Sequence, residues 1–368
     1  LADDCRFMKA LMERYEKGKF IIKNPAASVR EMDPFFPLSL QDRFFLITDS
    51  VESRLFHIIP PVTEGWRETV TLRDYPLPPR EMLDKRCYTR ADTGEPIAYI
   101  YTARGCPYDC CFCGAPVFFG KKVEARSTAS VIAEIEECLY THDIRNIFFR
   151  ADTFTYDKAW VLELCDSIVR KDLSFSWITN SRIDTIDRET AAAMREAGCD
   201  IIGFGMESGS REILEKSGKA LAKEMIKSRH DIVAKEGIRT FFHVLIGLPW
   251  ESRKSISDTG KILAEVDPHF IEVNVPYPLK RTPLFEFARK HDLFISDNLG
   301  EYSHAEPILR SFHLSASDIS SCRKRLLRRF YMRGTFIIRA LGMMRNWGNV
   351  KNVTARGYHL LRACWESS

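Results

Sequence analysis

The sequence predicts an α/β fold, namely a partial (β/α)6 barrel of the TIM type with an irregular N-terminal linker region and a helical C-terminal extension. Short apolar runs rich in β-forming residues recur from residue 96 onward, and segments of helical period separate them. The spacing of roughly 25–40 residues per unit suits right-handed strand–helix–strand crossovers. A closed eight-fold barrel needs about 250 residues, and the regular pattern ends near residue 290. Six units of an open barrel therefore fit better.

The predicted elements follow the hydrophobic pattern. The six predicted strands are residues 97–101, 147–149, 175–178, 201–204, 241–246 and 270–275. Apolar stripes of helical spacing lie at 131–139 and 161–169, with Asp157 as the expected N-cap of the second. A further helix is predicted at 187–198, where an acid can cap the start and a glycine ends the run.

The chain has 368 residues, which suggests two or three domains. We expect residues 1–95 to be the tail of an upstream domain plus a Pro-rich linker, 96–290 the barrel, and 291–368 a basic, mainly helical extension. A short helix is predicted at 7–15, and the prolines that follow interrupt regular structure. Because the first residue is Leu1, we expect the chain to begin partway through a longer protein.

Composition narrows the class of protein. The chain is 45% hydrophobic and 28% charged, which excludes a disordered, collagenous or multi-span membrane protein. No apolar run approaches the ~18 residues of a membrane helix, so no transmembrane segment is expected. Eleven cysteines, an odd number, occur in a chain too large to need disulfides. They favour a reducing, cytoplasmic location.

A dense cysteine cluster follows the first predicted barrel strand. Cys106, Cys110 and Cys113 have the spacing C-x3-C-x2-C. A structural zinc site would take four ligands, and no second Cys-x2-Cys or His-x3-His pair exists in the chain. A 4Fe-4S cluster held by three thiolates would leave one iron open, as a catalytic metal site does. Zinc and a chance cluster remain alternatives, and we expect the adjacent Cys111 to be structural.

At this motif the sequence resembles the radical S-adenosylmethionine superfamily, whose signature C-x3-C-x-aromatic-C is matched by these three cysteines together with Phe112. The resemblance implies that Cys106, Cys110 and Cys113 bind a 4Fe-4S cluster. It also implies that the open iron chelates S-adenosylmethionine and that one electron from the cluster cleaves a carbon–sulfur bond to give a 5′-deoxyadenosyl radical. A ferredoxin- or flavodoxin-type electron donor is implied as well.

Polar groups at the predicted strand ends could complete a cofactor site, because loops at the carboxyl ends of barrel strands face one cavity. We expect Glu207 to accept the ribose hydroxyls, Lys219 or Arg182 to pair with the cofactor carboxylate, and Asp152 to accept from its amino group. Alternatives are a helix-terminal charge for Glu207, a solvated helix lysine, an ordinary salt bridge for Arg182, and loop capping for Asp152. The remaining candidates are Phe112, Ser208 and Gly247, the last beside the adenine.

The motifs Gly-x-Glu-Ser-Gly-Ser at 205–210 and Gly-Leu-Pro-x-Glu at 247–251 extend the resemblance. They are similar to a subgroup with methylthiotransferases, coproporphyrinogen-type oxidases and cobalamin-linked enzymes. Residues 77–83 resemble the linker of the cobalamin-binding branch, which includes the anaerobic magnesium-protoporphyrin monomethyl ester cyclase and carbon methyltransferases. The cobalamin signature Asp-x-His-x-x-Gly is absent. We therefore expect that this chain alone does not hold cobalamin and that any cobalamin binding belongs to a full-length parent protein.

The tail is basic, with eleven Lys or Arg residues and one acid after Cys322, so the rest of the chain carries about −6. We expect a helix that packs its apolar stripe on the barrel, and we do not expect nucleic acid as a partner.

Our first hypothesis is an enzyme that starts radical chemistry, such as methyl transfer or cyclisation, on a small-molecule or biosynthetic-intermediate substrate. Alternatives are a tRNA or protein methylthiotransferase-like enzyme, and a non-catalytic iron–sulfur or zinc module. His243 is interpreted as a satisfied core histidine or a base.

Overall fold

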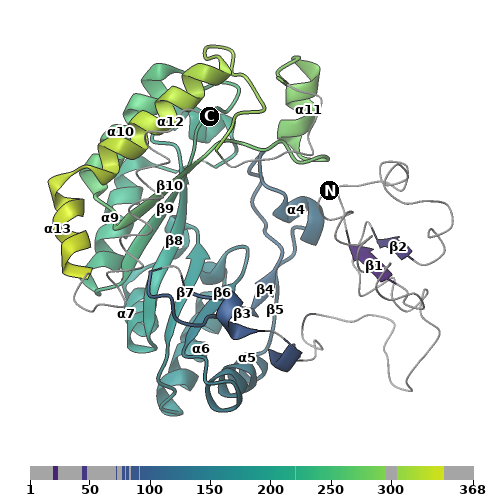
Figure 1. The fold of residues 1–368 in the computed structure, drawn as a ribbon, viewed down its shortest axis with the longest axis vertical. Coiled ribbons are helices and arrows are strands. Elements are labelled where there is room, and N and C mark those ends of the chain that lie inside the picture. The colour runs from purple at the N-terminus through teal and green to yellow at the C-terminus, as the bar shows by residue number, and fades with distance from the viewer. Residues whose placement is uncertain are drawn as a thin grey trace.

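The computed structural model describes residues 20–23, 44–47, 72, 77–78, 80–82, 84–90, 92–219, 221–295 and 305–343. Its centre is a parallel sheet of six strands that lie side by side in chain order (Figure 1). The strands are β3 (Ala98–Tyr101), β6 (Asn146–Arg150), β7 (Ser176–Ser181), β8 (Cys199–Glu207), β9 (Arg239–Leu245) and β10 (Phe270–Asn274). Every predicted strand overlaps one of these. The predicted α/β class and partial barrel are confirmed, with β3 and β10 as the edge strands.

Helices cover the outer face of the curved sheet (Figure 1). They are α5 (Thr128–Glu136), α6 (Lys158–Arg170), α7 (Arg188–Glu196), α9 (Lys223–Lys235) and α10 (Arg253–Val266). The predicted N-cap of α6 is confirmed, because the side chain of Asp157 accepts the Trp160 N–H. Asp187 caps α7 in the same way through Thr190. A five-residue π-helical segment, Glu137–Thr141, extends α5 and was not predicted.

Burial differs between the two faces of the sheet. Outward-pointing side chains such as Phe149, Trp177 and Phe204 are fully buried beneath the helices. The alternate residues point to the concave side, which we call the inner face, and most of them are half-buried or exposed. Since a packed core lies on only one side, the concave side remains accessible to a ligand.

Two small sheets were not predicted. The antiparallel hairpin of β4 (Ala103–Arg104) and β5 (Glu124–Ala125) encloses the cysteine loop and the short helix α4 (Ala115–Phe119). In the N-terminal region, where we expected irregular structure, β1 (Phe20–Lys23) pairs in parallel with β2 (Phe44–Ile47). The helix predicted at 7–15 lies outside the described residues.

The C-terminal extension packs helix α12 (Ala316–Tyr331) against the edge strand β10. The hydroxyl of Tyr331 accepts the Ile271 N–H at 3.1 Å, and Nε of Arg323 donates to the Val273 carbonyl at 2.7 Å. The apolar stripe of α12 is buried, as expected. In the following helix α13 (Gly334–Met343) the stripe ends, since Ile338 is 72% exposed. Helix α12 therefore protects an edge that could otherwise pair with another chain.

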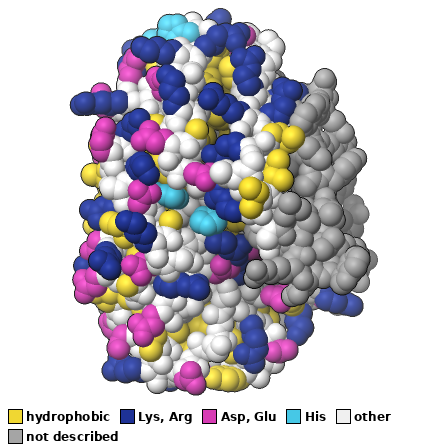
Figure 2. Space-filling view, turned by 90° about the vertical axis from the view of Figure 1, so that its left-hand side faces the viewer, with side chains coloured by type: hydrophobic (Ala, Val, Ile, Leu, Met, Phe, Trp, Pro, Cys, Tyr) yellow, Lys and Arg dark blue, Asp and Glu magenta, His cyan; other side chains and the backbone are white. Residues whose placement is uncertain are grey.

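Several basic side chains of the tail are engaged within the chain. Arg333 and Arg339 pair with Asp267 at the end of α10, at 2.8 and 2.7 Å. Figure 2 shows the face that carries the outer helices, where Lys and Arg are interspersed with Asp and Glu over most of the surface. Among the described helices, none is long and apolar enough to span a membrane. The nine described cysteines are all free thiols.

A buried ion cluster anchors the linker to the barrel. The carboxylate of Glu134 on α5, with a side chain only 2% exposed, pairs with both Arg80 of the linker and Arg126 after β5. Arg80 also contacts Glu137, with Nη1 to Oε2 at 3.3 Å, and donates to the Tyr99 carbonyl. Two carboxylates thus face two guanidinium groups at the start of the barrel, and Glu134 is the partner that both arginines share.

We predict that Glu134→Ala lowers the free energy of unfolding by about 3–5 kcal/mol, because two buried arginines would lose their common partner. The matched control is Glu136→Ala, two residues along the same helix. Glu136 pairs with Lys171 at the surface and is 36% exposed, so its loss is expected to cost less than about 1 kcal/mol. Urea denaturation of the two variants measures the difference, and similar destabilisation by both would contradict the assignment.

Candidate functional site

The cysteine loop is held at its start by the neighbouring strand end. The Gly105 N–H donates to Oδ2 of Asp152, which follows β6, at 2.7 Å. Gly105 has a φ of +89°, and a Cβ there would lie 2.1 Å from the Lys122 carbonyl oxygen. The position therefore requires glycine. The next amide, of Cys106, donates to the Gly120 carbonyl at 3.1 Å.

Two other elements hold the middle of the loop. The N–H of Cys111 donates to the Ser217 carbonyl, and the carbonyl of Cys111 accepts the Leu284 N–H, both at 2.9 Å. Gly218, with a φ of +75°, lies so close to Asp109 that a Cβ would be 2.4 Å from its carbonyl oxygen. The loop is thus held against the β6 end, the turn after α8 (Arg211–Lys216) and helix α11 (Pro283–Lys290).

Each of the three motif thiols has a polar neighbour. The Ala115 N–H donates to Sγ of Cys113 at 3.4 Å, and Nη1 of Arg182 lies 3.9 Å from Sγ of Cys110. The hydroxyl of Thr153 lies 4.0 Å from Sγ of the buried Cys106. The extra thiol differs, because Cys111 packs, like Phe112, against a second apolar cluster. Its members are Ile213, Leu248, Leu284, Ala288, Leu293 and Leu309.

Burial raises the pKa of three thiols in the loop, those of Cys110, Cys111 and Cys113. It raises that of Cys113 to about 11 and that of Cys111 to about 12. The pKa of Cys110 is raised less, because the positive charges of Lys219 and Arg182 oppose desolvation. A raised pKa favours the protonated thiol, so binding of a metal centre by Cys110 and Cys113 would release their protons.

The donor set fits an iron–sulfur cluster. Such clusters are bound by Cys thiolates and are tuned by hydrogen bonds to sulfur, and this loop supplies three thiols with N–H and O–H neighbours. Across the described ranges, no three His, Cys, Asp or Glu side chains converge closely enough to hold a single metal ion.

Glu207 and Lys219, predicted to bind different parts of a cofactor, form an ion pair with each other. Nζ of Lys219 donates to Oε1 of Glu207 at 2.7 Å, and their side chains are 7% and 13% exposed. Lys219 lies in the turn after α8, so the alternative of a solvated helix lysine is wrong. A Cβ at Gly205 would lie 2.4 Å from both charged atoms, so the missing side chain makes room for the pair.

The backbone of Glu207 is strained, with a φ of +63° at the end of β8. Non-glycine residues held in the left-handed region cluster at functional sites, because other contacts must over-determine them. The alternative of a helix-terminal charge is not supported, since Glu207 is bonded to Lys219 and α8 begins only at Arg211.

Arg182 lies between the thiols and a carboxylate. Its guanidinium is stacked 3.8 Å from the ring centroid of Tyr108 and forms two hydrogen bonds with Asp184, at 2.9 and 2.7 Å. The salt bridge considered from the sequence is therefore present, beside the contact with Cys110. Tyr108 was not singled out from the sequence, although its position inside the cysteine loop is the signal that could have found it.

Ser208 and Gly247 shape the loops that follow β8 and β9. The hydroxyl of the fully buried Ser208 lies 3.3 Å from that of Thr259 on α10 and accepts the Ser210 N–H. Gly247 has a φ of +97°, and a Cβ there would lie 3.0 Å from Ile319 of α12. Both turn geometry and the covering helix require glycine at 247.

Glu251 was quoted only as part of a motif, yet it organises this loop. Its fully buried Oε2 accepts the Gly247 N–H at 2.6 Å. Its carbonyl accepts the hydroxyl of Ser311, which belongs to the C-terminal extension. Desolvation raises the pKa of Glu251 to about 8, although hydrogen bonds from the Gly247 and Leu248 backbone lower it.

His243 lies on the inner face of β9 and not in the core. Its Nδ1 is 3.1 Å from Oε2 of Glu272, and a Cβ at Gly203 would lie 2.9 Å from its Nε2. Its side chain is 30% exposed, so the interpretation as a satisfied core histidine is wrong.

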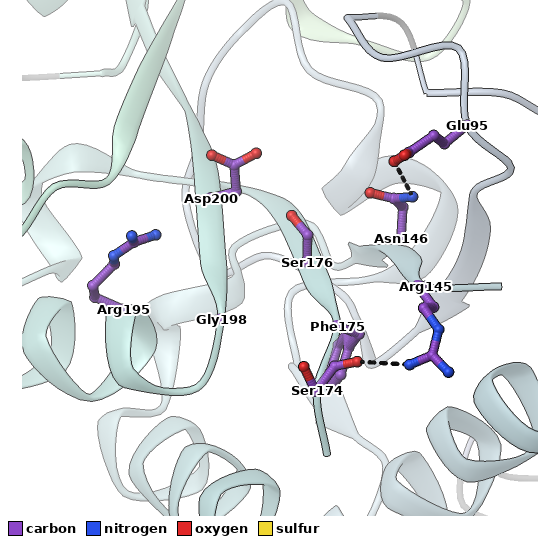
Figure 3. A pocket seen from close by; sticks show the side chains of 9 residues that line it. All are labelled: Glu95, Arg145, Asn146, Ser174, Phe175, Ser176, Arg195, Gly198 and Asp200. Carbon is purple, nitrogen blue, oxygen red and sulfur yellow. Dashed lines mark hydrogen bonds between the residues drawn. The ribbon is translucent and has the colours of Figure 1, made fainter. Parts of the chain in front are cut away.

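A separate pocket of about 450 Å³ lies at the opposite edge of the sheet (Figure 3). It is lined by residues at the N-terminal ends of strands, among them Asn146, Ser176 and Asp200. Asn146 donates to Glu95 and Arg145 donates to the Ser174 carbonyl. Active sites of βα barrels form at the other edge, so this pocket is distinct from the cysteine site.

Residues 100–262 match the family model of the radical SAM superfamily. This segment is therefore a radical SAM domain, and the chain carries the domain that defines that class of enzymes. The matched residues include the cysteine loop, four whole strands of the sheet (β6 to β9) and the second half of β3, whereas β10 and α11 lie beyond the match.

The chain is similar in sequence to two relatives and in fold to one solved structure. The chain is 30% identical to an uncharacterised methyltransferase of Pyrococcus horikoshii over 72% of this chain and 58% of the relative. It is 24% identical to the anaerobic magnesium-protoporphyrin IX monomethyl ester cyclase of Rubrivivax gelatinosus, over 66% and 43%. The cobalamin-dependent S-adenosylmethionine radical enzyme OxsB shares the fold, with a TM-score of 0.67, 13% identity, and coverage of 98% and 60%. The chain thus spans only about half the length of these relatives.

We predict that Glu251 makes stability depend on pH. A carboxyl group whose pKa is about 8 in the folded chain and near 4.5 when unfolded binds its proton more tightly in the folded state. The free energy of unfolding therefore falls as the pH rises from about 4.5 to about 8. Glu251→Gln keeps an acceptor for the Gly247 N–H but removes this titration.

Urea denaturation at pH 5, 6.5 and 8 checks this prediction. The wild type is expected to lose stability relative to Glu251→Gln over this range, at no more than about 1.4 kcal/mol per pH unit. Parallel pH profiles for the two proteins would show that Glu251 does not titrate there.

Proposed function

We propose that this domain binds a 4Fe-4S cluster through Cys106, Cys110 and Cys113 and cleaves S-adenosylmethionine reductively to start radical chemistry. One observation carries the proposal: a three-thiol loop with polar neighbours at each sulfur lies at the carboxyl ends of the strands of a radical SAM domain. When bound, the cluster would supply an electron and an open iron for the cofactor.

The chain's own residues would position and shield this centre. Arg182, fixed by Asp184 and stacked on Tyr108, places a positive charge beside Cys110. The adjacent Glu207–Lys219 pair offers one carboxylate and one ammonium group at low exposure. Since both are already oriented, either could pair with a polar group of the cofactor with little loss of side-chain entropy.

We propose further that the substrate is a small molecule modified by methyl transfer, cyclisation or a related reaction, and that a ferredoxin or flavodoxin supplies the electron. The names of the relatives support this range of reactions. The solved structure of OxsB has cobalamin bound. The expectation that this chain alone does not hold it stays a prediction.

Anaerobic reconstitution tests the proposed function. The wild type is expected to bind about four irons and, once reduced, to release 5′-deoxyadenosine from S-adenosylmethionine. Cys106→Ala, Cys110→Ala and Cys113→Ala should each abolish release, because each removes a ligand. Cys111→Ala is the matched control, since Cys111 packs against apolar side chains.

The measurements are iron and sulfide content, the visible and electron paramagnetic resonance spectra, and chromatography of the nucleoside product. Zinc in place of iron, or a wild-type cluster that yields no 5′-deoxyadenosine, would reject the proposal in favour of a non-catalytic module. Loss of release in Cys111→Ala alone would reject the ligand assignment.

A further inference from the structure

Aromatic rings are exposed on the inner face at one edge of the sheet. Along β3, Ala98 and Ile100 are buried against the helices, whereas Tyr99 and Tyr101 point to the inner face and are 47% and 49% exposed. Phe148 of β6 lies beside them, with its ring centroid 5.4 Å from that of Tyr99. Contiguous exposed apolar patches mark binding sites, whereas single scattered apolar residues on a surface need no such explanation.

Two guanidinium groups border these rings. Arg150, the last residue of β6, lies 5.1 Å from the ring centroid of Phe148. Arg104 of β4 lies 5.8 Å from the ring of Tyr101 and 5.9 Å from that of Phe119. We call this set the aromatic wall. It consists of Tyr99, Tyr101, Arg104, Phe119, Phe148 and Arg150.

The aromatic wall contains two guanidinium groups, those of Arg104 and Arg150. On the other strands the charged groups are paired, Lys219 with Glu207 and His243 with Glu272. Within the described residues, Arg150 forms no ion pair. The carboxylate of Asp152 accepts the Gly105 N–H and interacts electrostatically with Arg150 and Arg104, without a direct ion pair to Arg150.

The position of the wall links it to the cysteine loop. Tyr101 and Arg150 are register partners at the carboxyl ends of β3 and β6. The same strand ends lead into Gly105 and Asp152, whose hydrogen bond fixes the start of the loop before Cys106. A molecule lying on the wall would therefore lie next to the three thiols.

We propose that the aromatic wall binds the substrate, and that this substrate is a planar conjugated molecule bearing a carboxylate or another anionic group. The rings provide a flat surface for stacking. The guanidinium of Arg150 presents a planar set of donors that matches a carboxylate, and it would repel a cation. The inference rests on the proposed function only for the statement that the bound molecule is a substrate.

The test uses two pyrene probes that differ in charge, 1-pyrenebutyrate and neutral 1-pyrenebutanol, titrated by fluorescence anisotropy against the anaerobically reconstituted full chain. We expect the anion to bind at least about tenfold more tightly, as one charge-assisted pair provides. Arg150→Gln should reduce this preference to less than about threefold, because it lowers the affinity for the anion more than the affinity for the butanol. Arg150→Lys should restore part of it, because the charge remains.

Arg145→Gln is the matched control. It removes a positive charge just before the same strand, but at the opposite edge, where Arg145 lines the pocket of Figure 3. Equal affinity of the wild type for both probes, or an equal effect of Arg145→Gln, overturns the inference. Release of 5′-deoxyadenosine is measured on the same preparation. Release without charge preference overturns only this inference, and charge preference without release overturns only the proposed function.

Discussion

The site depends on the one-sided burial of a parallel sheet. Helices cover the outer face, where side chains such as Trp177 and Phe242 are fully buried, and this packing fixes the strands. All six strands run in the same direction, so their carboxyl ends meet at one edge. Among the described residues, most inner-face side chains are half-buried or exposed, and apolar packing there is confined to the second cluster beside Leu245.

That edge is built by contacts that no single element could provide. The cysteine loop is bonded to residues after β6, to the turn after α8 and to the start of α11. Glycines at 105 and 218 allow the backbone to come close, at positions where a side chain would collide with a carbonyl oxygen. The loop is therefore ordered before any cluster binds, which reduces the entropy lost on binding.

Charge is distributed unevenly over the accessible surface. Near the thiols the charged groups are paired in fixed geometries, as in Arg182 with Asp184 and Lys219 with Glu207. The aromatic wall places Arg150, which forms no ion pair among the described residues, beside exposed rings. This arrangement separates a preorganised cofactor region from a region suited to recognising a flat anion. The C-terminal helix α12 contributes from outside, by covering the β10 edge and contacting the Gly247 turn.

The fold was predictable to a large extent because the hydrophobic period records which face of each element is buried. The six strands, the helices α5, α6 and α7 and the caps at Asp157 and Asp187 follow from local pattern alone. The β4–β5 hairpin and the β1–β2 pair were missed, since two- and four-residue strands leave no readable alternation. The cysteine motif was equally local, with all its ligands within eight residues.

The partners of the other site residues could not be predicted, because they depend on distances between segments far apart in the chain. Glu207 and Lys219 were expected to act separately and instead form one pair, and Tyr108 became relevant only through its stacking on Arg182. The sequence by itself determined the strand–helix alternation and the three-thiol motif, since both are set by neighbours in the chain. Only the tertiary structure decided which charges are paired and where rings and arginines lie exposed, because these depend on how the strands are brought side by side.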